Sequence, residues 1–330
     1  MINKLFFPAA IVSSCFFLSC EDNKEADIPD IPSTITGETI ASYNVAKEDM
    51  IRSIPEEFIQ AARNNLHIAY QHTSHGTHVS YGLFGLQDYK AGDDILFGVT
   101  NNNPASGKLD FRDYALADYA DDGDDAADLS VDETAFIQAT RNYLDDPENA
   151  EINVIMWSLC SITGHNVTGN YLPGMQTLIN EYGAGGSKVG ASAGKRDNPV
   201  TFIFMTGHAE ADNNIGDERP MNQADTIIGY CNAKKYFCLD YFGIDTHDMN
   251  DNYWTDAGDN GDSDDYGGNF YTYWQNSHAE GEGYYYNKDA PGGTITYGAH
   301  NTQHITANRK AYAMWWILAR IAGWDGETTN

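Results

Sequence analysis

The sequence predicts an α/β fold, a three-layer sandwich built around a central parallel sheet. Three short apolar runs, residues 152–157, 200–206 and 235–241, are typical of strands that are covered on both faces. Segments with helical composition separate these runs along the chain. Buried strands that alternate with helices favour parallel strands joined by crossover helices, with helices on both sides of the sheet.

The first part of the predicted domain begins with one helix and one strand. Residues 56–65 have helical composition, and residues 66–71 form a short apolar strand. The sequence His-Thr-Ser-His-Gly at 72–76 ends this strand, and a helix is expected over 77–86. Residues 87–130 are rich in Gly, Asn and Asp and predict no regular element.

The remaining helices follow the same logic. They are predicted over residues 132–144, 171–182, 222–232 and 306–322, the first capped by Asp132 and the last ended by Gly323. Between the third strand and the last helix, residues 245–298 form a long Asp-, Gly- and Tyr-rich insertion without a clear period.

The N-terminus predicts export. Residues 1–19 contain one Lys and an apolar run too short to span a bilayer, and Cys20 follows Leu-Ser. This segment resembles a bacterial lipoprotein signal, which implies a mature chain that begins at a lipidated Cys20 and is anchored to the outer membrane, in the periplasm or on the cell surface. An ordinary cleaved signal peptide is the alternative. Residues 20–45 are interpreted as an acidic linker, and residues 46–326 as one domain.

The composition excludes some partners. The chain has 48 Asp and Glu against 19 Lys and Arg, a formal charge of −29. Nucleic acids and anionic lipid surfaces are recognised by clustered Lys and Arg, so neither is an expected partner. Cys160, Cys231 and Cys238 show no metal-ligand spacing and are predicted to be buried.

Polar residues gather after the predicted strands. In a parallel sheet the carboxyl ends of the strands share one edge, where α/β proteins place their sites. The segments that should meet there are 72–76, 157–161, 207–210, 240–245 and 298–304.

Two of these segments resemble the SGNH/GDSL hydrolase superfamily. Its nucleophilic Ser follows the first strand, as Ser74 does here, and its catalytic His precedes the last helix in an Asp-x-x-His motif. The matching stretch here is Asn301-x-x-His304, with His300 as a competitor. The family's Gly-x-Asn-Asp block falls on residues 158–161, where its Asn is absent. A His-x-Ser turn, a Trp-Ser turn, a Thr-Gly-His turn and a Trp-rich final helix also resemble a divergent branch of this superfamily.

The resemblance implies ester hydrolysis. Ser74 would be the nucleophile, His304 or His300 its base, and Asp240, or Asp245, the acid that orients the base. The residues expected to bind the substrate or the oxyanion are His72, His75, Gly76, Trp157, Ser158, Gly207 and His208. A simpler interpretation makes Ser74 a helix N-cap and His304 a helix-capping residue.

Metal sites are the rival interpretation. His75 and His78, with His208 or Asp212, could hold an ion that activates water, although no His-Glu-x-x-His motif is present. The acidic loops 121–125 and 256–265 could bind a structural Ca²⁺, but their spacing fails the EF-hand pattern and favours solvated loops. No cofactor is therefore expected.

Many aromatic residues lie in the insertion. Aromatic rings beside carboxylates and amides are common in carbohydrate sites, while core packing of a long loop is the alternative. The hypothesis is therefore a lipid-anchored esterase that removes acyl groups from a carbohydrate or polysaccharide. The alternatives are a non-catalytic glycan-binding protein, and a glycoside hydrolase whose acid–base pair comes from Glu210, Asp212 and Asp240.

Overall fold

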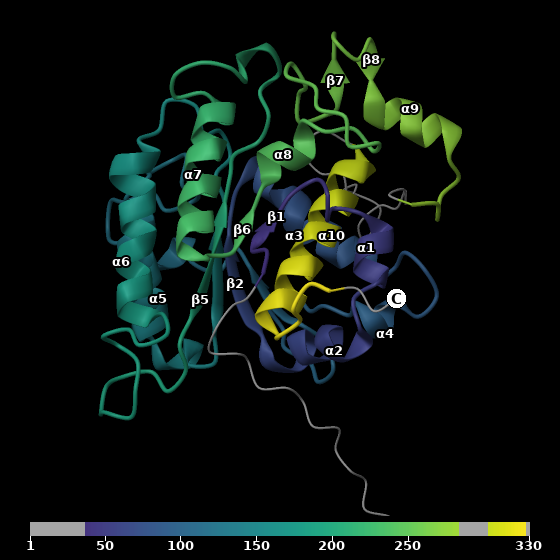
Figure 1. The fold of residues 1–330 in the computed structure, drawn as a ribbon. Helices are drawn as coiled ribbons and strands as arrows, with labels where there is room; N and C mark the ends of the chain where they lie inside the picture. The colour runs from purple at the N-terminus through teal and green to yellow at the C-terminus, as the bar shows by residue number, and fades with distance from the viewer. Residues whose placement is uncertain (1–36, 284–302, 328–330) are drawn as a thin grey trace, which may run out of the picture.

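The computed structural model describes residues 37–283 and 303–327. Its centre is a six-stranded parallel sheet in the order β1-β6-β5-β4-β2-β3. The strands are β1 (Ile40–Ala41), β2 (His67–Gln71), β3 (Asp110–Asp113), β4 (Val154–Trp157), β5 (Thr201–Met205) and β6 (Cys238–Leu239). Helices cover both faces of this sheet (Figure 1). The predicted three-layer α/β sandwich is confirmed.

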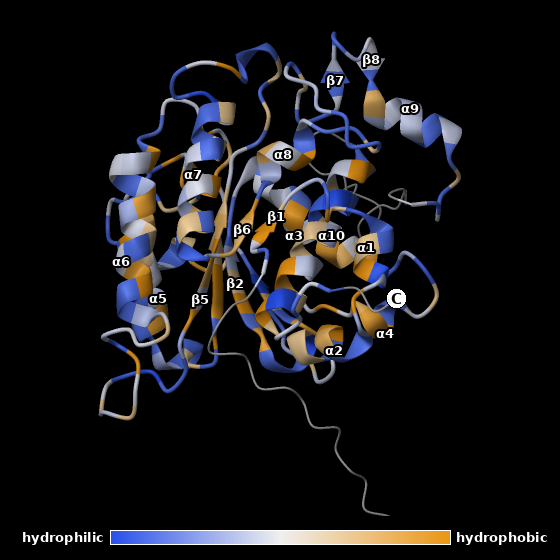
Figure 2. Ribbon diagram, in the orientation of Figure 1, coloured by the Kyte–Doolittle hydropathy of each residue, from blue (hydrophilic) through white to orange (hydrophobic). Residues whose placement is uncertain are grey.

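The two helical layers pack on opposite faces of the strands. One layer contains α1 (Glu48–Arg52), α2 (Glu56–Asn65), α3 (Thr77–Leu86), α4 (Asp93–Leu96) and α10 (His304–Ile321). The other contains α5 (Ala135–Asp145), α6 (Leu172–Tyr182) and α7 (Pro220–Lys234). In β4, Val154 and Met156 join the first core and Ile155 and Trp157 the second, because successive strand residues point to opposite faces. The strands are accordingly the apolar centre of the molecule (Figure 2).

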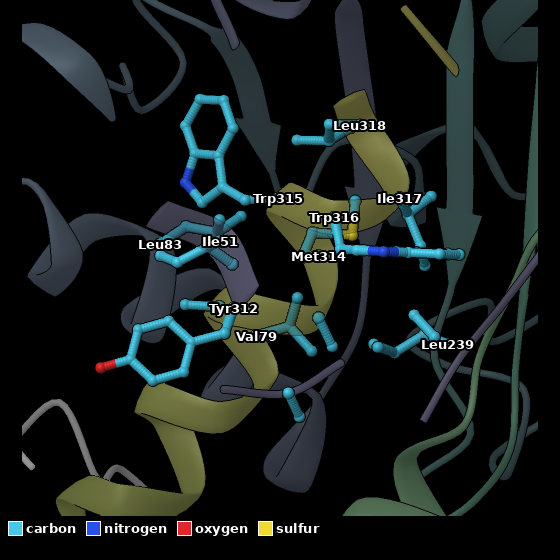
Figure 3. Close-up of a cluster of buried hydrophobic side chains, with 14 of the residues drawn as sticks. Ile51, Val79, Leu83, Leu239, Tyr312, Met314, Trp315, Trp316, Ile317 and Leu318 are labelled. Carbon is cyan, nitrogen blue, oxygen red and sulfur yellow. The ribbon is translucent and has the colours of Figure 1, made fainter. Parts of the chain in front are cut away.

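Helix α10 lies in the middle of the first layer. All of its residues are buried, and its apolar side chains pack with Val79 and Leu83 of α3 and with Leu239 of β6 (Figure 3). The two helices approach closely at Gly82, where an added Cβ would be 2.1 Å from the carbonyl oxygen of Ala307. A helix that is buried all round is typical of a large core rather than of a surface.

The insertion lies beyond the carboxyl end of the sheet (Figure 1). Helix α8 (Tyr241–Asp245) leads into it, and it contains the antiparallel pair β7 (Asp262–Ser263) and β8 (Gly268–Asn269), and α9 (Phe270–Ser277). The sequence pattern predicted none of these elements. Short helical turns connect the main elements: η1 (Ser74–Gly76), η2 (Ala117–Tyr119), η3 (Pro147–Asn149), the π-helix η4 (Val167–Tyr171) and η5 (Ala211–Asn213).

Several predicted boundaries are corrected. The linker expected over 20–45 is too long, because β1 at Ile40–Ala41 pairs with β6 inside the sheet. The strand expected over 235–241 shortens to two residues, since Asp240 caps α8. Strand β3 lies in the segment that predicted no element. Helix α5 starts at Ala135 rather than at Asp132. The Asp132 side chain lies just before the helix and accepts hydrogen bonds from the amides of Thr134 and Ala135.

Some predictions fall outside the described residues. These are the signal peptide, the lipidated Cys20, His300 and the end of the insertion, residues 284–298. Within the described ranges, the helices are all too short or too polar to cross a bilayer.

Candidate active site

Four side chains from four loops meet at the carboxyl edge of the sheet. His75 follows β2, Cys160 follows β4 and His208 follows β5, while Asp259 comes from the insertion. The Nδ1 of His75 lies 3.2 Å from the Sγ of Cys160, and its Nε2 lies 3.0 Å from Oδ2 of Asp259. The rings of His75 and His208 stack with centroids 3.6 Å apart. We call these four residues the thiol cluster.

The turn after β2 places His75 by an unusual backbone. Ser74 has φ +43°, in the left-handed region that non-glycine residues rarely adopt. Gly76 lies so close to the strand that an added Cβ would be 2.4 Å from Cβ of His72 and 2.8 Å from Oγ of Ser158. This tight turn aims the His75 ring at the β4 loop. Backbone strain of this kind is concentrated at functional sites.

The cluster favours a thiolate. Burial alone would raise the pKa of Cys160, but hydrogen bonds from the rings of His208 and His75 and from the His75 main-chain N–H outweigh it and lower this pKa to about 5. Burial would lower the pKa of His75, but its hydrogen bonds to Asp259 and Cys160 raise that pKa to about 9. Between these values the pair is an imidazolium and a thiolate, the form in which Cys is a nucleophile.

Buried groups hold both rings in place. The Nδ1–H of His208 donates to the carbonyl oxygen of Ala209 at 2.7 Å. The Ala209 amide donates to Oδ2 of Asp245 at 3.2 Å, and the other oxygen of Asp245 accepts from Nζ of Lys310 in α10. The Asp245–Lys310 pair is fully buried. It therefore ties the loop of His208 to the central helix.

A second set of hydrogen bonds fixes the turn that contains His75. The hydroxyl of Tyr241 donates to the carbonyl oxygen of His75 at 2.9 Å and accepts from Nδ1 of His78 at 2.6 Å. His78 is buried and faces Tyr241, so it supports the turn from beneath. The metal site that the sequence suggested for His75 and His78 is therefore not formed, because His78 bonds to Tyr241 instead.

The cluster also provides the donor set of a soft metal. Among the described residues, His75, Cys160 and His208 are the group whose ligand atoms all lie within 4.8 Å of one another. A histidine binds a metal through a lone pair in its ring plane, however, and the two rings are stacked with an interplanar angle of 16°. One ion cannot lie in the planes of both rings when the rings are stacked face to face with their centroids 3.6 Å apart. The geometry therefore fits a hydrogen-bonded thiolate better than a shared metal ion.

Ser74 and His304 lie in the topological slots that the sequence predicted. Ser74 is exposed, directly before the amide that hydrogen-bonds Cys160. His304 is buried and begins α10. Within the described residues the Ser74 hydroxyl forms no hydrogen bond, either with His304 or with another group. His300, the competing base, lies outside the described residues.

Other predicted site residues have structural surroundings. His72 is fully buried and bonded through Nε2 to Asp113 at 2.8 Å, and the indole N–H of Trp157 donates to Thr140 at 2.9 Å. Ser158 is fully buried, and Gly207 packs where a Cβ would lie 2.7 Å from Cβ of Ile162. These four residues are buried in the core.

Two main-chain amides near Ser74 that were expected to bind the oxyanion already donate hydrogen bonds within the protein. The Gly76 amide donates to the carbonyl oxygen of Thr73 at 2.9 Å, and the His75 amide donates to Cys160. Neither amide is therefore open for an oxyanion in this conformation.

The predicted acids also have other partners. Asp240 is buried and accepts hydrogen bonds from Ser42, Thr206 and the Gly243 amide, so it caps α8 instead of orienting a histidine. Glu210 accepts from the hydroxyls of Ser161 and Thr163 at 2.6 and 2.7 Å. Each carboxylate is held by its own hydroxyl partners, which gives no support to a carboxylate pair that would cleave glycosides.

The acidic loop 256–265 is closed by hydrogen bonds within the insertion. Asp256 accepts from the hydroxyl of Ser263 and from the Asp265 amide, and Asp262 accepts from the side chains of Asn260 and Asn269. These carboxylates act as turn caps in the described loop.

Sequence reasoning missed two members of the thiol cluster. Cys160 was expected to be buried like Cys231 and Cys238, yet it is half-buried and faces the site. Its place in the turn after a predicted strand was the available signal. Asp259 had no signal, because it is one of many aspartates in an insertion without a period.

Comparison with known proteins adds no relative: the chain matches no family model, no curated protein and no solved structure.

Proposed function

We propose that the protein hydrolyses acyl esters by covalent catalysis, with Cys160 as the nucleophile, His75 as the general acid and base, and Asp259 as the group that orients His75. The supporting observation is the continuous path Sγ–Nδ1 (3.2 Å) and Nε2–Oδ2 (3.0 Å). A nucleophile bonded to a base, which is in turn oriented by a third group, is the arrangement that activates Cys and Ser.

The residues account for both halves of such a reaction. The Cys160 thiolate attacks the acyl carbonyl carbon, and the ester C–O bond breaks as the leaving alkoxide takes the Nδ1 proton of His75. The product is a thioester on Cys160 and a neutral His75. His75 then removes a proton from water, the hydroxide attacks the thioester, and the carboxylic acid and the Cys160 thiolate are released. Asp259 holds Nε2–H throughout and stabilises the imidazolium.

Ser74 is the second candidate nucleophile in this proposal. Its support is the left-handed backbone and exposed hydroxyl at the end of β2, the position at which the SGNH resemblance expects a nucleophile. His304, or His300, would then be the base. The thiol cluster is the stronger candidate because its base is already within hydrogen-bond distance of the nucleophile.

The proposed substrate is an acylated carbohydrate outside the cytoplasm. The lipoprotein-like N-terminus supports attachment to the outer membrane, in the periplasm or at the surface, where such polymers are met. The negative charge supports a neutral rather than an anionic substrate.

The test is turnover of a chromogenic acetyl ester by the purified protein and its variants. We expect Cys160→Ala to lower kcat/KM by at least about 10³-fold and Ser74→Ala to change it by less than about fivefold. Cys231→Ala, at a thiol of α7 that is buried in the core, is the matched control. Mass spectrometry of a slow substrate should detect an acyl group on the Cys160 peptide.

Other outcomes reject this assignment. Loss of activity in Ser74→Ala with full activity in Cys160→Ala would make Ser74 the nucleophile. If the wild-type protein binds acylated glycans but hydrolyses no ester, the esterase hypothesis is rejected in favour of a glycan-binding protein.

A further inference from the structure

A pocket lies in the insertion, beside α9. It has a volume of about 410 Å³ and lies between the loop that follows α8 and helix α9. Its walls include Tyr266, Phe270, Tyr273 and Trp274. None of these residues belongs to the thiol cluster, so the pocket has to be explained separately.

The aromatic walls form a rigid surface. Tyr266 packs edge-on against Phe270, with centroids 5.7 Å apart, and leans on Tyr273 at 5.6 Å. Trp274 is stacked on His278 at 3.6 Å. Phe270 is buried, whereas Tyr273 is 54 % exposed. Phe270 therefore anchors the wall in the core, while Tyr273 presents its ring to solvent.

Three polar groups at this pocket have no hydrogen-bond partner among the residues that the structure describes. The hydroxyls of Tyr266 and Tyr273 and the side-chain amide of Asn250 form no hydrogen bonds within the described residues. A phenol can donate and accept, and an amide offers two donors and an acceptor. The pocket thus offers both kinds of hydrogen-bonding group beside exposed aromatic surface.

The acidic group of the pocket is already saturated. Asp248 accepts hydrogen bonds from the amides of Asn250 and Asn252, from the Asn252 side chain and from the indole of Trp254. Burial would raise the pKa of Asp248, but these bonds lower it, so the carboxylate is ionised and shapes the loop. Its charge repels anions, while its occupied oxygens leave little to bind a cation.

We propose that this pocket binds a neutral sugar ring of a glycan. The apolar face of a pyranose would lie on the Tyr273 ring, and its hydroxyls would exchange hydrogen bonds with Tyr266, Tyr273 and Asn250. Ring stacking combined with a few convergent polar groups is the chemistry of such sites. This inference does not require cleavage at Cys160, although Asp259 of the thiol cluster comes from the same insertion.

Binding of neutral oligosaccharides tests the inference. The purified protein is titrated with cello-, xylo-, manno- and chitohexaose, and binding is followed by calorimetry and by tryptophan fluorescence. We expect at least one of the four to bind. We expect Tyr273→Ala to weaken that binding at least about tenfold, and Tyr273→Phe about threefold because the ring remains.

A matched control separates the pocket from the rest of the insertion. Tyr253 is also exposed (41 %) and lies in the insertion, but it is not part of the pocket wall. Tyr253→Ala should bind with wild-type affinity, and Cys160→Ala should bind normally while failing to hydrolyse esters. Unfolding curves check that each variant is folded.

Three results would overturn the inference: no binding of any of the four oligosaccharides, equal binding by wild type and a folded Tyr273→Ala, or binding of tetramethylammonium in their place. Ester turnover without oligosaccharide binding would reject this pocket and leave the proposed reaction standing. Oligosaccharide binding without turnover would do the reverse.

Discussion

Two histidine–aspartate pairs at the end of β2 show how burial changes the role of the same chemistry. His72 and Asp113 are 2.8 Å apart, and His75 and Asp259 are 3.0 Å apart. The His72 ring is fully buried, stacks on Tyr70 and also contacts the Ser80 hydroxyl at 3.3 Å. The His75 ring contacts the half-buried thiol of Cys160 at the carboxyl edge of the sheet. The first pair and its Ser80 contact are buried in the core, whereas the second pair contacts a thiol at the carboxyl edge of the sheet.

The largest expected effect separates the two histidines. His75→Ala should lower kcat/KM for an acetyl ester by at least about 10³-fold, because the thiolate loses its proton donor and base. Its free energy of unfolding should fall by only about 1 kcal/mol. His72→Ala should instead lose about 3 kcal/mol of stability, since Asp113 is left buried without its partner. Kinetics and urea unfolding measure the two effects. Equal losses of activity in the two folded variants would contradict a catalytic role for His75 and a purely structural role for His72.

The next prediction concerns pH. Alkylation of Cys160 by iodoacetamide should have its midpoint at about pH 5, because thiolate is the reactive form and its pKa is lowered to about 5. In His75→Ala the midpoint should move toward the ordinary thiol value of about 8.5. A folded His72→Ala should keep the low midpoint. A midpoint near 8 in the wild type would show that Cys160 is an ordinary thiol.

The activity profile should follow from the same two groups. Below about pH 5, Cys160 is protonated and cannot attack; above about pH 9, His75 has lost the proton that the leaving group needs. We therefore expect kcat/KM to rise through about 5 and to fall through about 9. A profile that instead rises through about 7 and stays level would point to a neutral histidine serving a serine.

Substitutions of the two partner aspartates, Asp259 and Asp113, should have smaller effects than those of the histidines. Asp259→Asn should lower kcat/KM by about 10- to 100-fold, because the amide still orients His75 but no longer stabilises its charge. It should also narrow the pH range of activity, since the raised pKa of His75 depends on Asp259. Asp113→Asn should change stability more than kcat/KM. An Asp259→Asn variant with the wild-type pH profile would remove Asp259 from the mechanism.

The smallest expected effect is that of a chelator. Dialysis against EDTA should leave ester turnover unchanged, because the stacked rings of His75 and His208 do not converge on one ion. Elemental analysis before and after dialysis is the matching measurement. Loss of activity that Zn²⁺ restores would establish the metal interpretation in place of the thiolate.

From the sequence alone, the four inner strands of the sheet (β2, β4, β5 and β6) and the edge that holds the site could be predicted, but the outer strands β1 and β3 could not. Continuous apolar runs identify buried strands, because a strand covered on both faces cannot alternate with polar residues. Three of the segments expected at the carboxyl edge contain members of the thiol cluster, namely His75, Cys160 and His208. Parallel topology brings those segments together whatever their sequence separation.

Which polar residues meet at that edge was settled only by the folded chain. Pairing in space assigned Asp240 to a helix cap and His72 to the core, and it brought Asp259 across 184 residues to His75. Local sequence could not foresee this, because a side chain's protonation and reactivity depend on its burial and on its neighbours in the fold. The same holds for the pocket beside α9, whose walls come from an insertion with no pattern that predicts its shape.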